Sequence, residues 1–221
     1  MAAAVEGFVK LSSLIVAGLI GLSALSLADQ NNIGKSQWMV RIRAMSLTPA
    51  NDSGAFTALG TNFPANAVNL SNKVFPEVDA TYFFTKNWAL ELILTYPQQH
   101  DVSLTGAGNI GTVTHLPPVL SAQYHWPNDK CPVEPYVGLG INYTIITDSN
   151  LSAGGTPLDV TKSSVGLAYG AGLDYKLNER WSLNLDYKHV YIRTNVKAGG
   201  AILTNADINP NLVSFGIGYH F

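Results

Sequence analysis

The chain ends in the stretch Asn211-Leu-Val-Ser-Phe-Gly-Ile-Gly-Tyr-His-Phe221, which alternates between two kinds of side chain. One face is apolar, with Val213, Phe215, Ile217, Tyr219 and Phe221, and the other is small or polar, with Ser214, Gly216, Gly218 and His220. An alternation of period two is typical of a β-strand whose two faces have different surroundings. A closing strand that reaches the final aromatic residue is expected in an outer-membrane barrel, where the apolar face meets lipid.

The opposite end of the sequence predicts export. Lys10 precedes an apolar run from Leu11 to Leu25, and Ser26-Leu27-Ala28 places small residues at the positions that a signal peptidase reads. We therefore expect a signal peptide over residues 1–28 and one mature domain over residues 29–221. A membrane anchor is the alternative, but the run is short for a spanning helix, and a good cleavage site follows it.

Composition narrows the class of protein. Charged residues make up only 13% of the chain, about half of what a soluble domain usually carries. Beyond the signal peptide, no apolar stretch approaches the roughly 18 residues that a membrane helix needs. An unusually apolar soluble β protein and a transmembrane barrel both fit. The net charge of −2 gives no reason to expect nucleic acid as a partner, and the single cysteine, Cys131, is interpreted as an incidental turn residue.

Seven further segments share the alternating pattern, which gives eight strands in all. They cover residues 37–47, 77–85, 88–96, 119–126, 136–145, 164–176 and 181–193. Most are about nine to eleven residues long, which is enough to cross a bilayer at a tilt. Aromatic side chains gather near the strand ends, as in the girdles of membrane barrels.

The connections between these segments alternate in length. Short ones cover 86–87, 127–135 and 177–180, and long ones cover 48–76, 97–118, 146–163 and 194–210. This predicts an all-β fold, an eight-stranded antiparallel up-and-down transmembrane β-barrel with both termini on the periplasmic side. A soluble lipocalin-like barrel is the alternative. It would have to bury about twenty large apolar side chains inside, and eight strands leave no such volume.

Two blocks in the middle of the chain resemble the outer membrane protein W family. They are THLPPVLSAQY over Thr114–Tyr124 and PYVGLGINYT over Pro135–Thr144, and the resemblance continues through Gly172–Tyr175 to the aromatic C-terminus. It covers nearly all of the mature chain and is weakest in the loop 48–76, which leaves the choice of ligand open. The resemblance implies an eight-stranded barrel of the Gram-negative outer membrane, proposed to pass small hydrophobic molecules. The family that it resembles includes proteins encoded beside alkane and aromatic degradation pathways.

Partners follow from the same assignment. The spacing of Gly216, Tyr219 and Phe221 resembles the C-terminal assembly signal of bacterial outer-membrane proteins, so we expect the barrel-assembly machinery as a partner. Outer-membrane lipid, lipopolysaccharide and a small hydrophobic ligand complete the expected partners. No cofactor and no metal is expected, because no histidine cluster has zinc-ligand spacing.

The inward faces of the strands are expected to be sorted by height. Toward the periplasm we expect a charge layer of Arg41, Glu91, Asp174, Lys176, Asp186 and Lys188, whose ion pairs block free flow. Higher up, Met45, Ile93, Val119, Val190 and Ile192 would line a path for a hydrophobic guest, although both layers could be packing alone. Phe83 breaks the sorting, because it points inward low in the barrel. His189 falls on the lipid-facing register, so it lies either at the outer interface or next to a bulge.

A blocked base requires another exit. Leu116, Pro117 and Pro118 enter the fourth strand, and proline removes hydrogen bonds from a β-ladder. We expect a lateral opening here, through which a guest leaves for the outer leaflet; alternatively, the prolines only end a strand above the membrane. Apolar residues of the long loops would form the mouth of the path: Phe56, Leu59, Phe63, Leu151 and Leu158. They could also pack only against each other.

Other classes of function remain as alternatives. One is a structural or receptor barrel that serves in adhesion or is bound by phages or toxins. Another is a lipid-modifying enzyme, but the chain has no Gly-x-Ser-x-Gly elbow. His100-Asp101 followed by Ser103 is spacing that is common by chance. We therefore expect no enzymatic activity and predict passive uptake of small hydrophobic molecules.

Overall fold

The computed structural model describes residues 37–58 and 60–221. All of them belong to the compact unit Lys35–Phe221. The predicted signal peptide with its cleavage site, and also Leu59, lie outside the described residues. No helix in the described ranges is long and apolar enough to cross a membrane.

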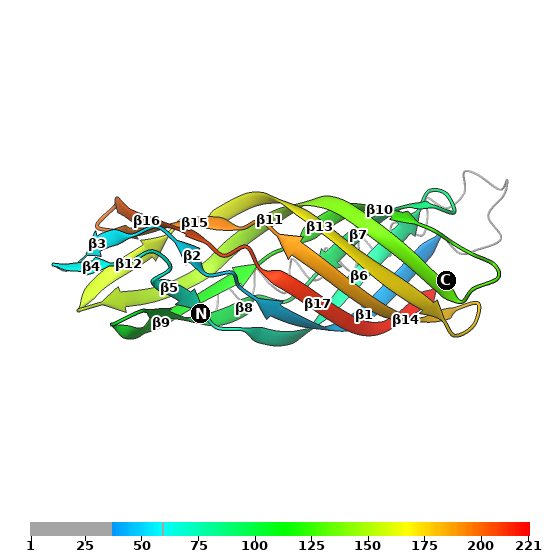
Figure 1. The fold of residues 1–221 in the computed structure, drawn as a ribbon, viewed down its shortest axis with the longest axis horizontal. Helices are drawn as coiled ribbons and strands as arrows, with labels where there is room; N and C mark the ends of the chain where they lie inside the picture. The colour runs from blue at the N-terminus through cyan, green and yellow to red at the C-terminus, as the bar shows by residue number, and fades with distance from the viewer. Residues whose placement is uncertain (1–36, 59) are drawn as a thin grey trace, which may run out of the picture. The chain divides into compact units, whose positions relative to one another are not determined.

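Eight antiparallel strands close into a barrel, which confirms the predicted fold (Figure 1). They are β1 (Trp38–Thr48), β6 (Lys73–Phe83), β7 (Trp88–Leu94), β10 (Val119–His125), β11 (Val133–Ala153), β13 (Ser163–Lys176), β14 (Trp181–Val190) and β17 (Asn211–His220). Each strand pairs with its neighbour along the chain, and β1 pairs with β17 from Met39 with His220 to Thr48 with Asn211. This pairing of the first strand with the last removes both sheet edges, as a lipid-exposed sheet requires.

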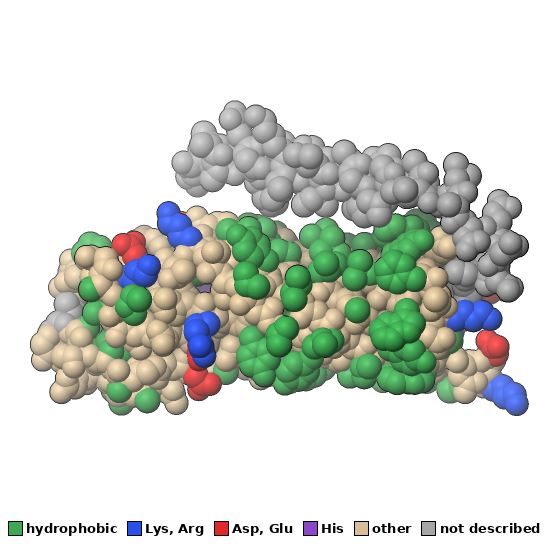
Figure 2. All heavy atoms as spheres, turned by 90° about the horizontal axis from the view of Figure 1, so that it is seen from above, with side chains coloured by type: hydrophobic (Ala, Val, Ile, Leu, Met, Phe, Trp, Pro, Cys, Tyr) green, Lys and Arg blue, Asp and Glu red, His purple; other side chains and the backbone are tan. Residues whose placement is uncertain are grey.

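The strand register sends apolar side chains outward and polar side chains inward. Ile42 is 57% exposed, whereas its neighbour Arg41 is 0% exposed. Figure 2 shows the outward hydrophobic side chains gathered in a band, with the Lys, Arg, Asp and Glu side chains of this face lying on either side of it. The band includes Val78, Leu90, Leu92, Leu139, Ile141, Leu167, Leu185, Phe215 and Ile217. An exposed apolar surface of this kind is stable against lipid and not against water.

The long connections fold into strands of their own, which the sequence pattern did not predict. They form an upper wall in which neighbours pair in the order β2 (Asp52–Ser53), β16 (Ala201–Asp207), β15 (Arg193–Ala198), β12 (Thr156–Val160), β11, β9 (Gly108–Leu116), β8 (Gln98–Leu104) and β5 (Val68–Leu70). A small hairpin of β3 (Phe56–Ala58) and β4 (Thr61–Phe63) adds to it. The strand expected over 136–145 is part of β11, which has 21 residues and continues into this wall.

Hydrogen bonds of two asparagines, one through its backbone and one through its side chain, join the two ends of the upper wall. The Asn66 backbone N–H donates to the Ser53 carbonyl oxygen at 2.8 Å, and the Leu70 N–H donates to Asn51 Oδ1 at 2.9 Å. Asn51 and Asn66 both have φ near +60°, a conformation that asparagine adopts more readily than most residues. The upper wall is thereby held closed around an interior that continues the lumen of the barrel.

Two smaller expectations concern single residues. His189 keeps the outward register, since the pairing of β13 with β14 runs from Lys176 to Ala168 without a shift. Its ring packs against Tyr169 and Tyr191, and Nδ1 lies 2.9 Å from Asn211 Oδ1. Of the two alternatives for His189, the outward position without a bulge is therefore the one observed. Cys131 is an exposed free cysteine in a turn.

Candidate functional site

Strand β1 shows how the lumen is layered. Its inward residues are Met39, Arg41, Arg43, Met45 and Leu47, in order from the periplasmic end. Inward side chains recur every second residue, so each step rises about 6.6 Å along the strand. An apolar floor, an ionic layer and a middle apolar layer therefore follow one another up the barrel.

The floor of the lumen consists of Met39, Phe83 and Ala89. The ring of Phe83 lies 5.0 Å from the ring of His125 and 6.4 Å from that of His220. The inward position of Phe83 low in the barrel is thus explained, because it lies below Arg41 and Arg43 and packs against His125.

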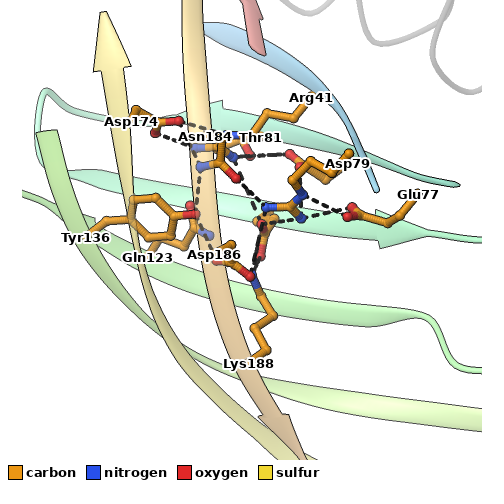
Figure 3. Close-up of polar contacts among 12 residues, drawn as sticks. Arg41, Glu77, Asp79, Thr81, Gln123, Tyr136, Asp174, Asn184, Asp186 and Lys188 are labelled. Atoms are coloured by element: carbon orange, nitrogen blue, oxygen red, sulfur yellow. Dashed lines mark hydrogen bonds and ion pairs between the residues drawn. The ribbon is translucent and has the colours of Figure 1, made fainter. Parts of the chain in front are cut away.

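Above the floor, two arginines of β1 pair with carboxylates on other strands (Figure 3). Arg41 pairs with Asp174 at 2.7 Å and with Asp79 at 3.2 Å. Arg43 donates to both oxygens of Glu77, at 2.7 and 2.8 Å. Such two-pronged contacts are the strongest that a guanidinium makes, and they fix its orientation.

A lysine completes the ionic layer. Lys188 Nζ lies 2.7 Å from Asp186 and 3.1 Å from Glu91, and the Tyr136 hydroxyl donates to Asp186 at 2.8 Å. We define the ionic layer as Arg41, Arg43, Glu77, Asp79, Glu91, Asp174, Asp186 and Lys188. All eight residues are buried, so this layer fills the cross-section of the lumen at its height.

The middle apolar layer lies directly above the ionic layer. It consists of Met45, Leu47, Phe75, Ile93, Val119, Ala168, Val190, Ile192, Ile208 and Leu212. A small cleft of about 10 Å³ opens among these residues, and Thr95, Pro117 and Pro210 also line it. The cleft therefore connects the middle apolar layer with the proline segment of the wall.

The β-ladder of the barrel wall is interrupted at this height. The pairing of β7 with β10 ends at Ile93 with Val119, and the pairing of β8 with β9 begins at Gln98 with His115. The segments between these pairs contain Pro97, Pro117 and Pro118, which have no N–H to donate. On the opposite side, the Pro118 carbonyl still accepts from the Tyr143 N–H at 3.1 Å. The interruption is thus confined to the side that faces the β7–β8 connection.

The upper wall encloses a larger apolar space, which we call the upper chamber. Its cavity has a volume of about 240 Å³ and is lined by residues that include Phe56, Phe63, Val102, Leu104, Leu151 and Leu158. The rings of Phe56 and Phe63 stack with centroids 5.0 Å apart. The chamber can hold a small apolar molecule, because almost every side chain that lines it is a hydrocarbon.

Comparisons with known proteins agree with this architecture. The model of the OmpW family matches residues 34–221. The chain belongs to the OmpW family. Outer membrane protein W of Vibrio cholerae is 34% identical over 218 residues, which cover 93% of this chain and 98% of that protein. This OmpW-family chain is accordingly a protein of the outer membrane, as predicted.

Two other relatives and one solved structure extend the comparison. Outer membrane protein AlkL of Ectopseudomonas oleovorans is 25% identical over 94% of this chain and 95% of its own length. The dibenzothiophene metabolism operon protein PahQ of Pseudomonas aeruginosa is 29% identical over 85% of this chain and 90% of its own length. The crystal structure of the outer membrane protein OprG from Pseudomonas aeruginosa matches with a TM-score of 0.73 and 25% identity, and covers 85% of this chain and 97% of that one.

The structure of this OmpW-family barrel brings most of the predicted site residues together. All five residues of the expected ligand path lie in the middle apolar layer, and four of the expected mouth residues lie in the upper chamber: Phe56, Phe63, Leu151 and Leu158. The fifth, Leu59, is outside the described residues. Leu116, Pro117 and Pro118 are half-buried at the interruption of the wall.

The charge layer has a different membership from the expected one. Five of the six expected residues belong to it, whereas Lys176 pairs with Glu134, which also contacts His125 at 3.3 Å. The prediction missed Arg43, Glu77 and Asp79, although the alternation had placed all three on inward faces. Arg43 lies two residues from Arg41, and Asp79 and Glu77 are paired with Arg41 and Arg43 on the neighbouring strand. This grouping of opposite charges was the signal, because isolated buried charges need partners.

The histidine, aspartate and serine of the loop 97–118 are not assembled for catalysis. His100 is buried, whereas Asp101, the next residue of β8, is exposed. His100 Nδ1 contacts the Ser71 carbonyl oxygen at 2.7 Å. Consecutive residues of a strand point to opposite faces, so Asp101 does not orient this ring.

Proposed function

We propose that this chain is a channel for the passive uptake of small hydrophobic molecules, which leave sideways through the barrel wall into the outer leaflet. The observation that carries the proposal is the vertical order of the lumen. An apolar chamber opens above, a second apolar layer lies below it, and the ionic layer closes the base. A guest that dissolves in the apolar layers is not solvated by buried ion pairs, which bind each other.

The interrupted ladder supports an exit at this height. It lies beside the middle apolar layer, and Pro117 lines the cleft there. The outer surface of the barrel carries the lipid-facing apolar band. A hydrophobic guest would therefore pass from the lumen into lipid without crossing the charges or the periplasmic water.

The names of relatives support the same class of substrate. PahQ is named for a dibenzothiophene metabolism operon, and dibenzothiophene is an apolar aromatic compound. For this chain, the relationship to PahQ and the apolar lumen together support an apolar aromatic guest, and dibenzothiophene is the natural probe.

The uptake proposal can be tested with a matched pair of alanines on β13. Ala168 is buried in the middle apolar layer, whereas Ala171 is exposed on the lipid face of the same strand. We expect Ala168→Trp to reduce dibenzothiophene uptake by cells at least fivefold, because the indole fills the path, and Ala171→Trp to leave uptake unchanged. The smaller Ala168→Leu should have an intermediate effect, and a heat-dependent shift in gel mobility verifies that each variant is folded. Equal uptake by all folded variants would contradict the proposal and favour a receptor function of the upper wall.

The lateral exit has a separate test. Pro117→Ala/Pro118→Ala restores two N–H donors, with which the ladder can continue across the interruption. We expect lower uptake of the same compound, while Pro157→Ala in β12 of the upper wall serves as the control. Unchanged uptake by the double variant would remove the lateral exit and leave the apolar path in place.

A further inference from the structure

Two histidines lie on the path between the two apolar spaces. On the inward face of β8, His100 lies two residues from Val102, on the side nearer the barrel. On the inward face of β9, His115 lies two residues from Val113, again on the side nearer the barrel. Pro117, two residues further along the chain from His115, lines the cleft of the middle apolar layer. Each step of two residues covers about 6.6 Å. A guest that moves from the upper chamber to the interruption of the wall therefore passes this pair.

The two imidazole rings form one buried unit. Their centroids are 4.9 Å apart and the planes are inclined by 20°. His100 is 0% exposed and His115 is 3% exposed. In a stacked pair neither ring edge points at the other ring, so stacking does not supply a hydrogen bond to the nitrogen atoms.

The environment fixes which nitrogen of His100 carries hydrogen. Nδ1 lies 2.7 Å from the Ser71 carbonyl oxygen. A carbonyl oxygen only accepts, so Nδ1 donates. In the neutral ring, Nε2 then has a lone pair and no hydrogen. Among the described residues, Nε2 has no hydrogen-bond partner, and a buried acceptor without one costs free energy.

Burial favours the neutral form of both rings. Burial lowers the pKa of His100, and the nearby Lys73 lowers it further, although the Ser71 carbonyl and Asp101 act in the opposite direction. Burial also lowers the pKa of His115 from 6.5 to about 3, and His100 contributes to that shift. In the neutral form, the pair therefore holds one buried acceptor, Nε2 of His100, between the two apolar spaces.

We propose that His100, held by Ser71 and stacked on His115, accepts a hydrogen bond from the hydroxyl group of an otherwise apolar guest. The chain then binds apolar alcohols and phenols in preference to hydrocarbons of the same size. Ethers and ketones gain nothing, because they have no hydrogen to donate to Nε2. This inference rests on the proposed uptake function and names the class of substrate for which the path is built.

Three naphthalenes of similar size test the preference in lipid nanodiscs that contain the mature chain. 1-Naphthol donates a hydrogen bond, 1-methoxynaphthalene only accepts, and 1-methylnaphthalene does neither. After correction for partition into empty nanodiscs, we expect 1-naphthol to bind about fivefold more tightly than the other two, which corresponds to about 1 kcal/mol. His100→Phe keeps an aromatic ring but has no acceptor, so the preference should vanish. His115→Phe keeps the stacked ring and the acceptor of His100, so the preference should persist.

A second measurement works on the unaltered protein. The ¹⁵N chemical shift of His100 Nε2 should move toward that of a hydrogen-bonded acceptor when 1-naphthol is added, and should not respond to 1-methylnaphthalene. If the three compounds bind equally and the shift does not change, the hydroxyl preference is overturned while the uptake function stands. Binding of none of them above empty nanodiscs would overturn the uptake function, and the preference with it.

Discussion

Arg43 shows why the base of this lumen cannot be treated as ordinary polar lining. Its guanidinium is buried and lies against Glu77, Asp79 and Glu91 at 2.7, 3.0 and 3.5 Å. Within the ionic layer, three cations face five carboxylates. Removal of one cation leaves several carboxylates buried without compensation, and this costs far more than the loss of a surface pair.

Arg43→Met should therefore destabilise the barrel by about 3 to 5 kcal/mol. Methionine keeps an unbranched apolar stem but has no guanidinium, so Glu77 loses its two hydrogen bonds. The free energy of unfolding is measured by urea titration in phospholipid vesicles, with tryptophan fluorescence as the signal. Arg193→Gln is the control, because Arg193 pairs with Asp207 on the exposed surface of the upper wall and such pairs contribute little. Equal stability of the two variants would show that the ionic layer does not hold the barrel together.

His115 makes stability depend on pH with a defined sign. Its pKa in the folded chain is about 3, below the ordinary value of 6.5. Between these values the unfolded chain binds a proton that the folded chain excludes, so stability is complete above about pH 6.5 and falls as the pH is lowered. From pH 5.5 to 4, the wild type should lose about 1.4 kcal/mol per pH unit more than His115→Phe does. Parallel pH profiles of the two proteins in urea titrations would refute the neutral buried state.

At the level of the strand, β17 has glycines on its inward face where the side chains of two arginines lie against it. Gly216 is paired with Arg43 and Gly218 with Arg41. A Cβ atom at Gly216 would meet the Cα of Arg43 at 2.6 Å and its Cγ at 2.8 Å. The small face of the terminal strand, which the sequence shows as an alternation, is thus the space that the two guanidinium groups need to reach across the lumen.

Gly216→Ala should destabilise the barrel by about 1 to 3 kcal/mol, because the added methyl group forces Arg43 and the backbone of β1 apart. Gly138→Ala is a matched control on β11. A Cβ atom there has its nearest neighbour, Cγ of Gln123, at 3.4 Å, an ordinary contact. The urea midpoint in vesicles should fall for the first variant and change little for the second, and a similar midpoint for both would contradict the close approach of β1 and β17.

The elements that could be predicted from the sequence are those with an apolar outer face. The alternation that ends at Phe221 recurs in every barrel strand. Because one face of each strand contacts lipid, every second residue has to be apolar. Strands of the upper wall carry no such pattern, and β2 has only two residues, Asp52 and Ser53. Its place depends on two hydrogen bonds in which Asn51 Oδ1 accepts from the Leu70 N–H and Asn66 Oδ1 accepts from the Ser53 N–H, and alternation does not encode them.

The same distinction holds for the candidate site. The inward direction of Met45 and Ile93 followed from the register, so their meeting in one layer could be predicted. The stacked pair of His100 and His115 could not be, because it depends on the folding of the loop 97–118 into the hairpin of β8 and β9. Pro97 was missed as a part of the interrupted wall for the same reason, since its neighbours are set by that hairpin.

For the molecule as a whole, the outer surface and the lumen are organised at matching heights. The apolar band surrounds the barrel strands, whereas the upper wall beyond it has Arg193, Lys197 and Asp207 among its residues. The upper wall would therefore stand in the water and sugar layer outside the bilayer, and the interruption near Pro117 would lie at the edge of the hydrocarbon. This arrangement is what a lateral exit into the outer leaflet needs.

An arginine scan of the surface distinguishes the two zones. Leu139 is 63% exposed on the barrel portion of β11, and Ile202 is 59% exposed on β16 in the upper wall. Leu139→Arg places a charge in hydrocarbon and should cost about 2 to 4 kcal/mol, as lipid-facing arginines near the bilayer midplane do. Ile202→Arg places the same charge in water and should leave the free energy of unfolding nearly unchanged. Both are measured by urea titration in vesicles. Equal costs at the two positions would mean that the band around Leu139 does not face lipid, and a lateral exit at Pro117 would then open into water.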